Sequence, residues 1–224
     1  MEENGKSILN RRAKMSGIER KIWNKMRSYD WKYFSDMRFE NRELRKFGRI
    51  QVLEKEGNES SWRTTYDDFP LWQAIPDLSE WIIKEVDEKE MEALGMCEEE
   101  EKMIKVAKGL NRSDLKLVLL HEIIHAYEGL SKPQTYAIYR QLLVLYFHEK
   151  LRKKIESKAL EEIIGIGLNF FIIEKGCHTP LFLLKSLDLD LRLNKPWGTV
   201  HSYEREDFFD GIQRRAIKRR EKKT

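Results

Sequence analysis

The chain has 224 residues, of which 41% are hydrophobic, 36% charged and 11% aromatic. This length is typical of one compact domain with appendages, and six Trp, eight Tyr and ten Phe are too many for a chain that builds no core. Twelve Gly, five Pro and the lack of any repeat at a fixed period exclude collagen-like and solenoid architectures.

The sequence does not have the features of a membrane-spanning or secreted protein. Its longest apolar stretch, from Ile163 to Ile173, is shorter than the roughly 20 residues that cross a bilayer and is interrupted by Asn169. The first 25 residues hold no continuous apolar segment of the kind found in signal peptides. Two cysteines, Cys97 and Cys177, are too few for a disulfide framework. We therefore expect a cytoplasmic protein with no membrane partner.

Charge is unevenly distributed along the chain. Residues 1–50 hold 14 Lys and Arg against 7 Asp and Glu, and residues 214–224 hold 7 against 1. Because the whole chain carries a net charge of +4, the segment between these basic ends is acidic. Basic ends favour nucleic acid as a partner, since each Lys or Arg that contacts a phosphate releases counterions. A solvated, frayed tail fits the same composition.

The N-terminal half gives mixed signals. Ser16 and Glu19 have the spacing of a capping box and predict a helix over 16–28. A second amphipathic stretch predicts a further helix over 31–47, and the apolar residues after it predict a short strand over 50–54.

The segment before the most apolar helix is less regular. Residues 62–81 contain three Trp and two Pro and predict irregular structure. The acidic run 98–101 lacks the spacing of a calcium loop, so we expect it on a solvated helix face. Residues 103–107 predict a strand, which we expect in a small sheet, together with 50–54, that covers the helix described next.

The clearest predicted element is the helix that contains LKLVLLHEIIHAYE. Asn111 or Ser113 can cap it, Asp114 lies in its first turn and Gly129 follows its last residue. Because this segment is apolar almost all round, we expect burial on most of its faces.

The C-terminal half is predicted to be helical at first and then irregular. Pro133 is expected to open a helix with its body over 136–154, and a further helix is expected over 157–174. The segment 176–200 is rich in Gly and Pro and predicts loops around one short helix.

Residues 121–125 have the pattern His-Glu-x-x-His. On a helix, residues four apart share a face, so the imidazoles of His121 and His125 can converge on one cation. Neutral imidazoles are standard zinc ligands. Glu122 lies about one hundred degrees round the helix from His121, where a general base for a zinc-activated water stands. Five His and 27 Glu in the chain give roughly 0.01 chance occurrences of this pattern.

The residues around this motif resemble a known group of enzymes. Residues 118–127, VLLHEIIHAY, are similar to the active-site helix of zincin metallopeptidases, and the strand and turn before them resemble those of SprT-like proteases and ImmA/IrrE-type minimal gluzincins. The likeness covers residues 103–153. It implies that His121 and His125 bind Zn²⁺, that Glu122 is the catalytic base, and that the substrate is a peptide bond of an intracellular protein.

The resemblance also bears on the third metal ligand. Minimal gluzincins supply a Glu from the next helix, some 20–30 residues on, and Glu149 meets that spacing. The His-Gly pair of SprT-like enzymes has no counterpart between 127 and 147. Glu149 is therefore the predicted ligand. The alternatives that stay open are His148, Glu128, Glu161 and Glu162.

Two further groups of residues have side chains that could take part in catalysis. A phenol from Tyr127, Tyr136, Tyr139 or Tyr146 is a candidate to stabilise an oxyanion, although aromatic residues at helical spacing more often belong to a core. The pair Cys177-His178 is interpreted as structural or incidental, because adjacent residues seldom face each other as a nucleophile and its base must.

We therefore expect an α+β fold that is predominantly α-helical, with a zincin-like core, an active-site helix, a small sheet and extra N-terminal helices. The expected function is that of a zinc-dependent peptidase that acts through a metal-bound water activated by Glu122. The alternative is a non-catalytic module that binds nucleic acid or protein and keeps a vestigial site. Four segments are predicted: a basic helical and irregular region (1–85), the metallopeptidase core (86–175), C-terminal loops with a short helix (176–213) and a basic tail (214–224).

Overall fold

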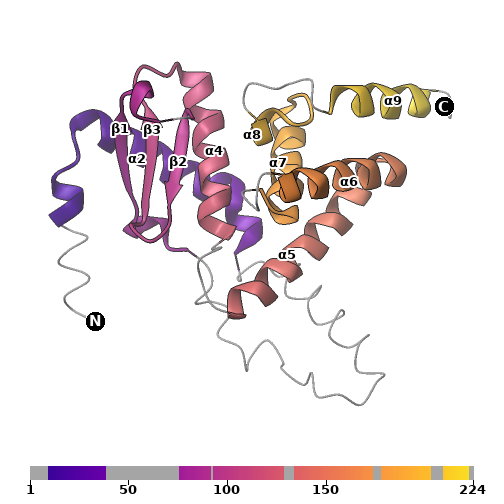
Figure 1. Ribbon diagram of the computed structural model, residues 1–224, viewed down its shortest axis with the longest axis horizontal. Coiled ribbons are helices and arrows are strands. Elements are labelled where there is room, and N and C mark those ends of the chain that lie inside the picture. Colours follow the sequence, from indigo (N-terminus) through magenta and orange to yellow (C-terminus); the bar gives the residue numbers. More distant parts are fainter. Residues whose placement is uncertain are drawn as a thin grey trace, which may run out of the picture. The chain divides into compact units, whose positions relative to one another are not determined.

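The computed structural model describes residues 10–38, 76–91, 93–128, 134–173, 178–202 and 209–221. The chain divides into two compact units. Of the described residues, the first holds 10–38 and those from 76 to 128, and the second holds those from 134 to 221. The first unit combines stretches that are far apart in the sequence, and each unit is described by itself below (Figure 1). The four segments predicted from the sequence are divided by composition and by the motif, and not by compactness. Their boundaries stay a prediction.

The first unit contains a small sheet and two long helices (Figure 1). In chain order its elements are helix α2 (Gly17–Phe34), a 3₁₀ turn (Ser35–Met37), a second 3₁₀ turn (Leu78–Glu80), strand β1 (Ile82–Val86), a third 3₁₀ turn (Glu88–Glu90), strands β2 (Gly95–Glu98) and β3 (Met103–Ala107), and helix α4 (Arg112–Glu128). Helix α2 contacts β1 and α4, while α4 contacts β2 and β3.

The sheet has the strand order β1-β3-β2, so β3 is central and β2 is an edge strand. Strand β1 runs parallel to β3 and β2 runs antiparallel to it. The prediction of a strand at 103–107 is therefore confirmed, whereas β1 and β2 were not predicted. The acidic run 98–101 is not on a helix, and that prediction is wrong. Glu98 ends β2, and the next residues form a turn in which the Lys102 N–H bonds the carbonyl of Glu99.

Helix α2 begins as its sequence predicts. The backbone N–H of Glu19 donates to Ser16 Oγ at 3.1 Å, and the Ser16 N–H donates to the Glu19 carboxylate at 2.6 Å, which completes the capping box. The helix continues to Phe34 because its buried stripe continues beyond position 28. Residues 31–34 are thus helical as predicted, but they belong to α2 and not to a separate helix, and residues 35–37 form a 3₁₀ turn. The rest of that prediction and the strand predicted at 50–54 lie outside the described residues.

Helix α4 is the most buried element of the first unit. Its cap is Asn111, whose Oδ1 accepts the backbone N–H groups of Ser113 at 2.8 Å and Asp114 at 3.0 Å. Twelve of its 17 residues are buried, as expected of a helix that is apolar nearly all round. Burial on both its sheet side and its α2 side fixes the orientation of the side chains near its C-terminal end.

The second unit is helical throughout the part that the structure describes. Its helices are α5 (Gln134–Arg152), α6 (Ser157–Ile173), α7 (Pro180–Leu193), α8 (Thr199–Ser202) and α9 (Asp210–Glu221). Helix α7 is central, because it contacts α5, α6 and α8. The predicted helices at 136–154 and 157–174 are confirmed to within two residues. The segment 214–224, predicted as a tail, contributes to α9 as far as Glu221.

The prediction of loops around one short helix at 176–200 is wrong. Helix α7 has 14 residues and a buried run from Leu181 to Asp190. Its start is marked by Thr179, whose side chain accepts the Phe182 N–H, followed by a proline at the first helical position. Its end is marked by Asn194 in the left-handed conformation. These are ordinary helix boundary signals, and the proline was interpreted as a loop residue instead.

The described chain is thus mostly helical with one small sheet, in agreement with the expected α+β class. Among the helices of the described residues, none combines the length and the apolar character that crossing a bilayer requires.

Candidate metal centre

The two histidines of the motif face each other on helix α4. Their Nε2 atoms lie 3.3 Å apart, and their ring centroids are 5.0 Å apart with an angle of 64° between the ring planes. The His121 side chain is nearly buried and that of His125 is 18% exposed. The backbone therefore brings together two imidazole nitrogens at one partly enclosed point, as the four-residue spacing predicts.

The distance between these nitrogens fits a shared zinc ion. Zinc binds imidazole nitrogen at about 2.0–2.1 Å with tetrahedral angles, and two such bonds leave about 3.3 Å between the nitrogens. The observed 3.3 Å equals this value. The donor set is also chemically suitable, because imidazole is a preferred ligand of zinc and of other late transition metals.

A buried carboxylate lies on the other side of one imidazole. The Oε2 atom of Glu128 is 3.5 Å from Nδ1 of His125, and the Glu128 side chain is fully buried. Burial alone lowers the pKa of His125, but the interaction with Glu128 and the charge of Glu122 outweigh it and raise that pKa. Because Glu128 contacts Nδ1 while Nε2 points toward His121, Glu128 is placed to orient the ring.

Glu122 is buried where α4 packs against the edge strand. Its side chain is 2% exposed. A Cβ atom added to Gly95 of β2 would lie 2.6 Å from Glu122 Oε1 and 2.6 Å from a methyl group of Val118. The strand backbone therefore approaches the carboxylate closely. Burial and then the negative charge of Glu122 raise the pKa of the nearby Cys97 thiol well above its usual value, so this thiol is protonated at neutral pH.

Helix α2 holds the end of α4 through a buried polar contact. The Tyr127 hydroxyl donates to Asp30 Oδ1 at 2.7 Å, and Arg38 donates to Asp30 Oδ2 at 2.5 Å. The Tyr127 ring also stacks on Phe34, with centroids 5.3 Å apart. Burial raises the pKa of Asp30, although Tyr127 and Arg38 lower it in part. Since its hydroxyl is bonded to Asp30 in the core, Tyr127 has a structural role and is not an oxyanion donor.

The remaining ligand candidates belong to the second unit, apart from Glu128. Glu149 is on α5, where its carboxylate accepts a bond from Arg152 at 2.9 Å. His148 is its neighbour on α5, and Glu161 and Glu162 are exposed residues of α6. The assignment of Glu149 as the third ligand stays a prediction.

Of the pair Cys177-His178, Cys177 lies outside the described residues. The His178 ring packs on Phe182, with centroids 4.4 Å apart, and lies 4.8 Å from the ring of His201. The role of the pair stays a prediction.

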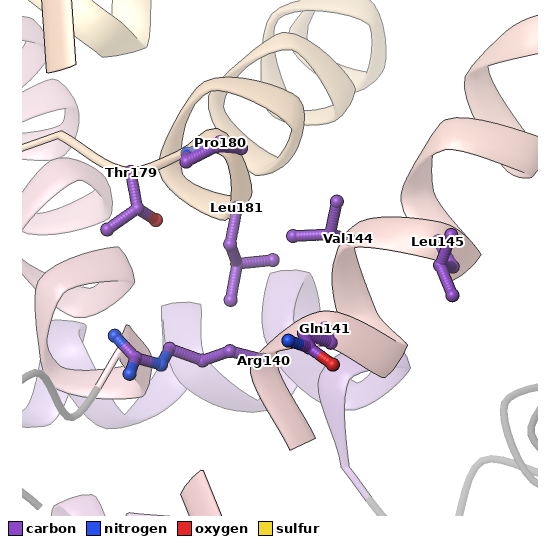
Figure 2. Close-up of a pocket in the computed structure, with 7 residues that line it drawn as sticks. All are labelled: Arg140, Gln141, Val144, Leu145, Thr179, Pro180 and Leu181. Atoms are coloured by element: carbon purple, nitrogen blue, oxygen red, sulfur yellow. The ribbon is translucent and has the colours of Figure 1, made fainter. Parts of the chain in front are cut away.

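A separate hollow is present in the second unit between α5 and the start of α7 (Figure 2). It has a volume of about 520 Å³. Figure 2 shows the Arg140 side chain extended across it below Leu181. Its lining consists of Arg140, Gln141, Val144, Leu145, Thr179, Pro180 and Leu181. This lining is largely apolar and includes no acid, histidine or cysteine, so α4 is the stronger candidate for chemistry.

Comparison of the chain with protein-family models, with curated proteins and with solved structures gives no match. The resemblance to zincins therefore rests on the motif and its surroundings.

Proposed function

We propose that the protein is a zinc-dependent peptidase whose active centre is on α4. In this proposal His121 and His125 hold the metal through their Nε2 atoms, and Glu122 is the general base. The observation that carries it is the 3.3 Å between the two Nε2 atoms, which is the spacing of two ligands of one tetrahedral zinc ion.

The surroundings of Glu122 support its role. When bound, zinc would lower the pKa of a coordinated water and polarise a carbonyl group. Glu122 directly follows His121 in sequence and is nearly buried, so its carboxylate would act where bulk water competes little for the proton. It would accept a proton from the attacking water and return it to the leaving amine. Glu128 would hold the His125 ring with Nε2 directed at the metal.

The edge strand offers a way to bind an extended substrate. Strand β2 pairs only with β3 among the strands that the structure describes, and its other side would offer backbone groups to a peptide. A peptide that adds to this edge is held by main-chain hydrogen bonds regardless of its side chains. Since Gly95 of β2 lies against Glu122, such a peptide would pass close to the general base. We therefore propose unfolded or extended protein segments as the substrate class.

Metal analysis and cleavage of a peptide library test the proposal together. Purified protein is expected to contain about one zinc ion per chain by elemental analysis, and mass spectrometry of the library is expected to reveal new peptide termini. His121→Ala is expected to lose both zinc and cleavage. Glu122→Gln is expected to keep zinc and to cleave about 10²–10⁴-fold more slowly, because it lacks the general base.

Two outcomes contradict the proposal at different steps. The two rings can also share a long hydrogen bond at 3.3 Å, and a wild-type protein that stays metal-free after incubation with zinc would favour that explanation. A zinc-loaded protein whose cleavage products do not change in Glu122→Gln would instead contradict the peptidase assignment. Zinc content of Glu149→Gln, compared with variants of His148, Glu161 and Glu162, identifies the third ligand.

A further inference from the structure

The outward face of α2 is strongly basic. Five cationic residues of this helix are exposed or half-exposed. We call these residues and Trp31 the basic face of α2; its cations are Arg20, Lys21, Lys25, Arg27 and Lys32. Lys21 and Lys25 are one turn apart, about 6 Å along the axis, and Lys32 follows about two turns later. The face therefore presents a row of positive charges along one side of the helix.

Both acidic residues of α2 are turned inward, where the fold uses them. Glu19 accepts the N–H of Ser16 in the capping box and the backbone N–H of Glu85 in β1 at 3.2 Å. Asp30 is 1% exposed and is bonded to Tyr127 and Arg38. The helix therefore places no carboxylate of its own on the basic face, although the charge of Arg27 acts on Asp30. Arg27 pairs with Asp77 on the surface at 3.4 Å.

Trp31 is the one large aromatic side chain that the basic face presents to solvent. It is 70% exposed. Arg38, which is held by Asp30, lies 5.4 Å from the centre of its ring. Trp23 on the same helix differs, because its Nε1–H donates to the Trp81 carbonyl at 2.8 Å and anchors the helix to the sheet region. Burial and hydrogen bonding thus account for Trp23 but not for Trp31.

We propose that the basic face of α2 binds single-stranded nucleic acid, with the lysines on successive phosphates and a base stacked on Trp31. Single-strand sites of this kind combine a positively charged track with exposed aromatic rings, on which any base can stack. Trp31 lies eleven residues after Arg20, three helical turns and about 16 Å along the same line of the surface. A strand that follows Arg20 and Arg27 along this line therefore reaches the indole, and the three lysines lie beside the line, about a third of a turn round the helix.

Three observations favour a single strand over other polyanions. A duplex keeps its bases stacked and has no free base face for Trp31. An anionic membrane needs an apolar helix face to insert, but the apolar face of α2 is buried on β1 and α4. An acidic protein would use the lysines without needing the exposed indole. The restraint of Arg38 by Asp30 also fixes the neighbourhood of the ring, which lowers the entropy cost of stacking.

Fluorescence anisotropy with labelled oligonucleotides tests this inference. Oligothymidylate and oligouridylate of one length separate DNA from RNA, and a duplex of that length and anionic vesicles are the competing polyanions. Trp31→Ala is expected to weaken single-strand binding about tenfold, and Trp31→Phe is expected to keep most of the affinity. Because the side chain is exposed, both variants are expected to keep the wild-type melting temperature.

The triple variant K21Q/K25Q/K32Q separates the charges from the ring. It is expected to reduce the slope of log affinity against log salt by about two. Its matched control is K153Q/K158Q/K195Q, which removes three exposed lysines of the second unit and is expected to bind like wild type. Equal weakening by the control, unchanged binding by Trp31→Ala, or tighter binding to duplex or vesicles would each overturn the inference. None of these outcomes depends on zinc or on Glu122.

Discussion

At the scale of single residues, the orienting role of Glu128 leads to a sharp prediction. Glu128→Gln keeps the shape of the side chain and an acceptor oxygen, but it removes the charge that faces Nδ1 of His125. We expect zinc affinity to fall about 10–100-fold, as is typical when the partner of a ligating histidine is changed. Competition with a chromophoric chelator measures this affinity directly.

The control for Glu128→Gln is Glu90→Gln, which removes one carboxylate from the exposed surface of the same unit. It is expected to bind zinc like wild type. If the two variants had the same affinity, Glu128 would not orient the ring. If Glu128→Gln lost zinc completely, as His121→Ala is expected to do, Glu128 would be a direct ligand.

The local part of the candidate site was predictable, because it depends on helix geometry alone. A spacing of four residues brings His121 and His125 to one face whatever surrounds the helix. The contact between Tyr127 and Asp30 was not predictable, since these residues are 97 positions apart and neither carries a motif. From the sequence, either Asn111 or Ser113 could be the N-cap of α4. The hydrogen bonds that Asn111 Oδ1 accepts show that Asn111 is the cap.

At the scale of elements, the packing of β2 on α4 predicts that Gly95 is essential to the site. Gly95→Ala places a methyl group within 2.6 Å of both Glu122 Oε1 and Val118. The Glu122 carboxylate can turn away, but Val118 is β-branched and fully buried. We therefore expect a stability loss of about 1–3 kcal/mol from overpacking and at least a tenfold loss of peptide cleavage from displacement of Glu122.

Met96→Ala is the matched control for Gly95→Ala, because Met96 is the next residue of β2 and is exposed. This variant is expected to change the free energy of unfolding, measured with urea, only slightly. Zinc binding is expected to persist in both variants, because the imidazoles are on the helix. Wild-type cleavage by Gly95→Ala would show that the strand and the carboxylate do not share this tight contact.

The elements that were predicted correctly have local signals of their own. The capping box of α2 and the apolar run of α4 indicate a helix before any tertiary contact is known. The edge strands β1 and β2 have five and four residues, and their extended conformation depends on pairing with β3, which the sequence does not reveal. The signals for α7 were present but were assigned to loops.

At the scale of the whole molecule, composition predicted the fold class but not how the chain is divided. Abundant aromatic residues and long apolar helices indicate a mostly helical α+β protein, and this is confirmed. The first compact unit, however, takes its described residues from two separate stretches of the chain. Tertiary packing decides which distant segments come together in one unit. Composition and motifs can only divide the chain into consecutive segments, so they do not predict this arrangement.

One buried carboxyl is expected to make the stability of the protein depend on pH. Asp190 of α7 is fully buried, and its two oxygens accept the backbone N–H groups of Gly198 at 2.7 Å and Val200 at 2.9 Å. It thereby joins the end of the α7 segment to the start of α8. Burial raises the pKa of Asp190 to about 8, although the hydrogen bonds from the backbone lower it in part.

The sign of this dependence follows from proton binding. The folded protein holds a proton on Asp190 up to pH values near 8, whereas the unfolded chain loses it near pH 4. Rising pH therefore favours the unfolded state, and the free energy of unfolding is expected to fall by up to about 1.4 kcal/mol per pH unit between these values. Asp190→Asn is expected to be less stable than wild type at low pH, because its amide nitrogen cannot accept a backbone hydrogen bond. Since this variant has no carboxyl group at position 190, its free energy of unfolding is expected not to fall with pH in this range. Urea unfolding at a series of pH values measures both curves, and parallel curves for the two proteins would show that Asp190 is ionised in the folded state.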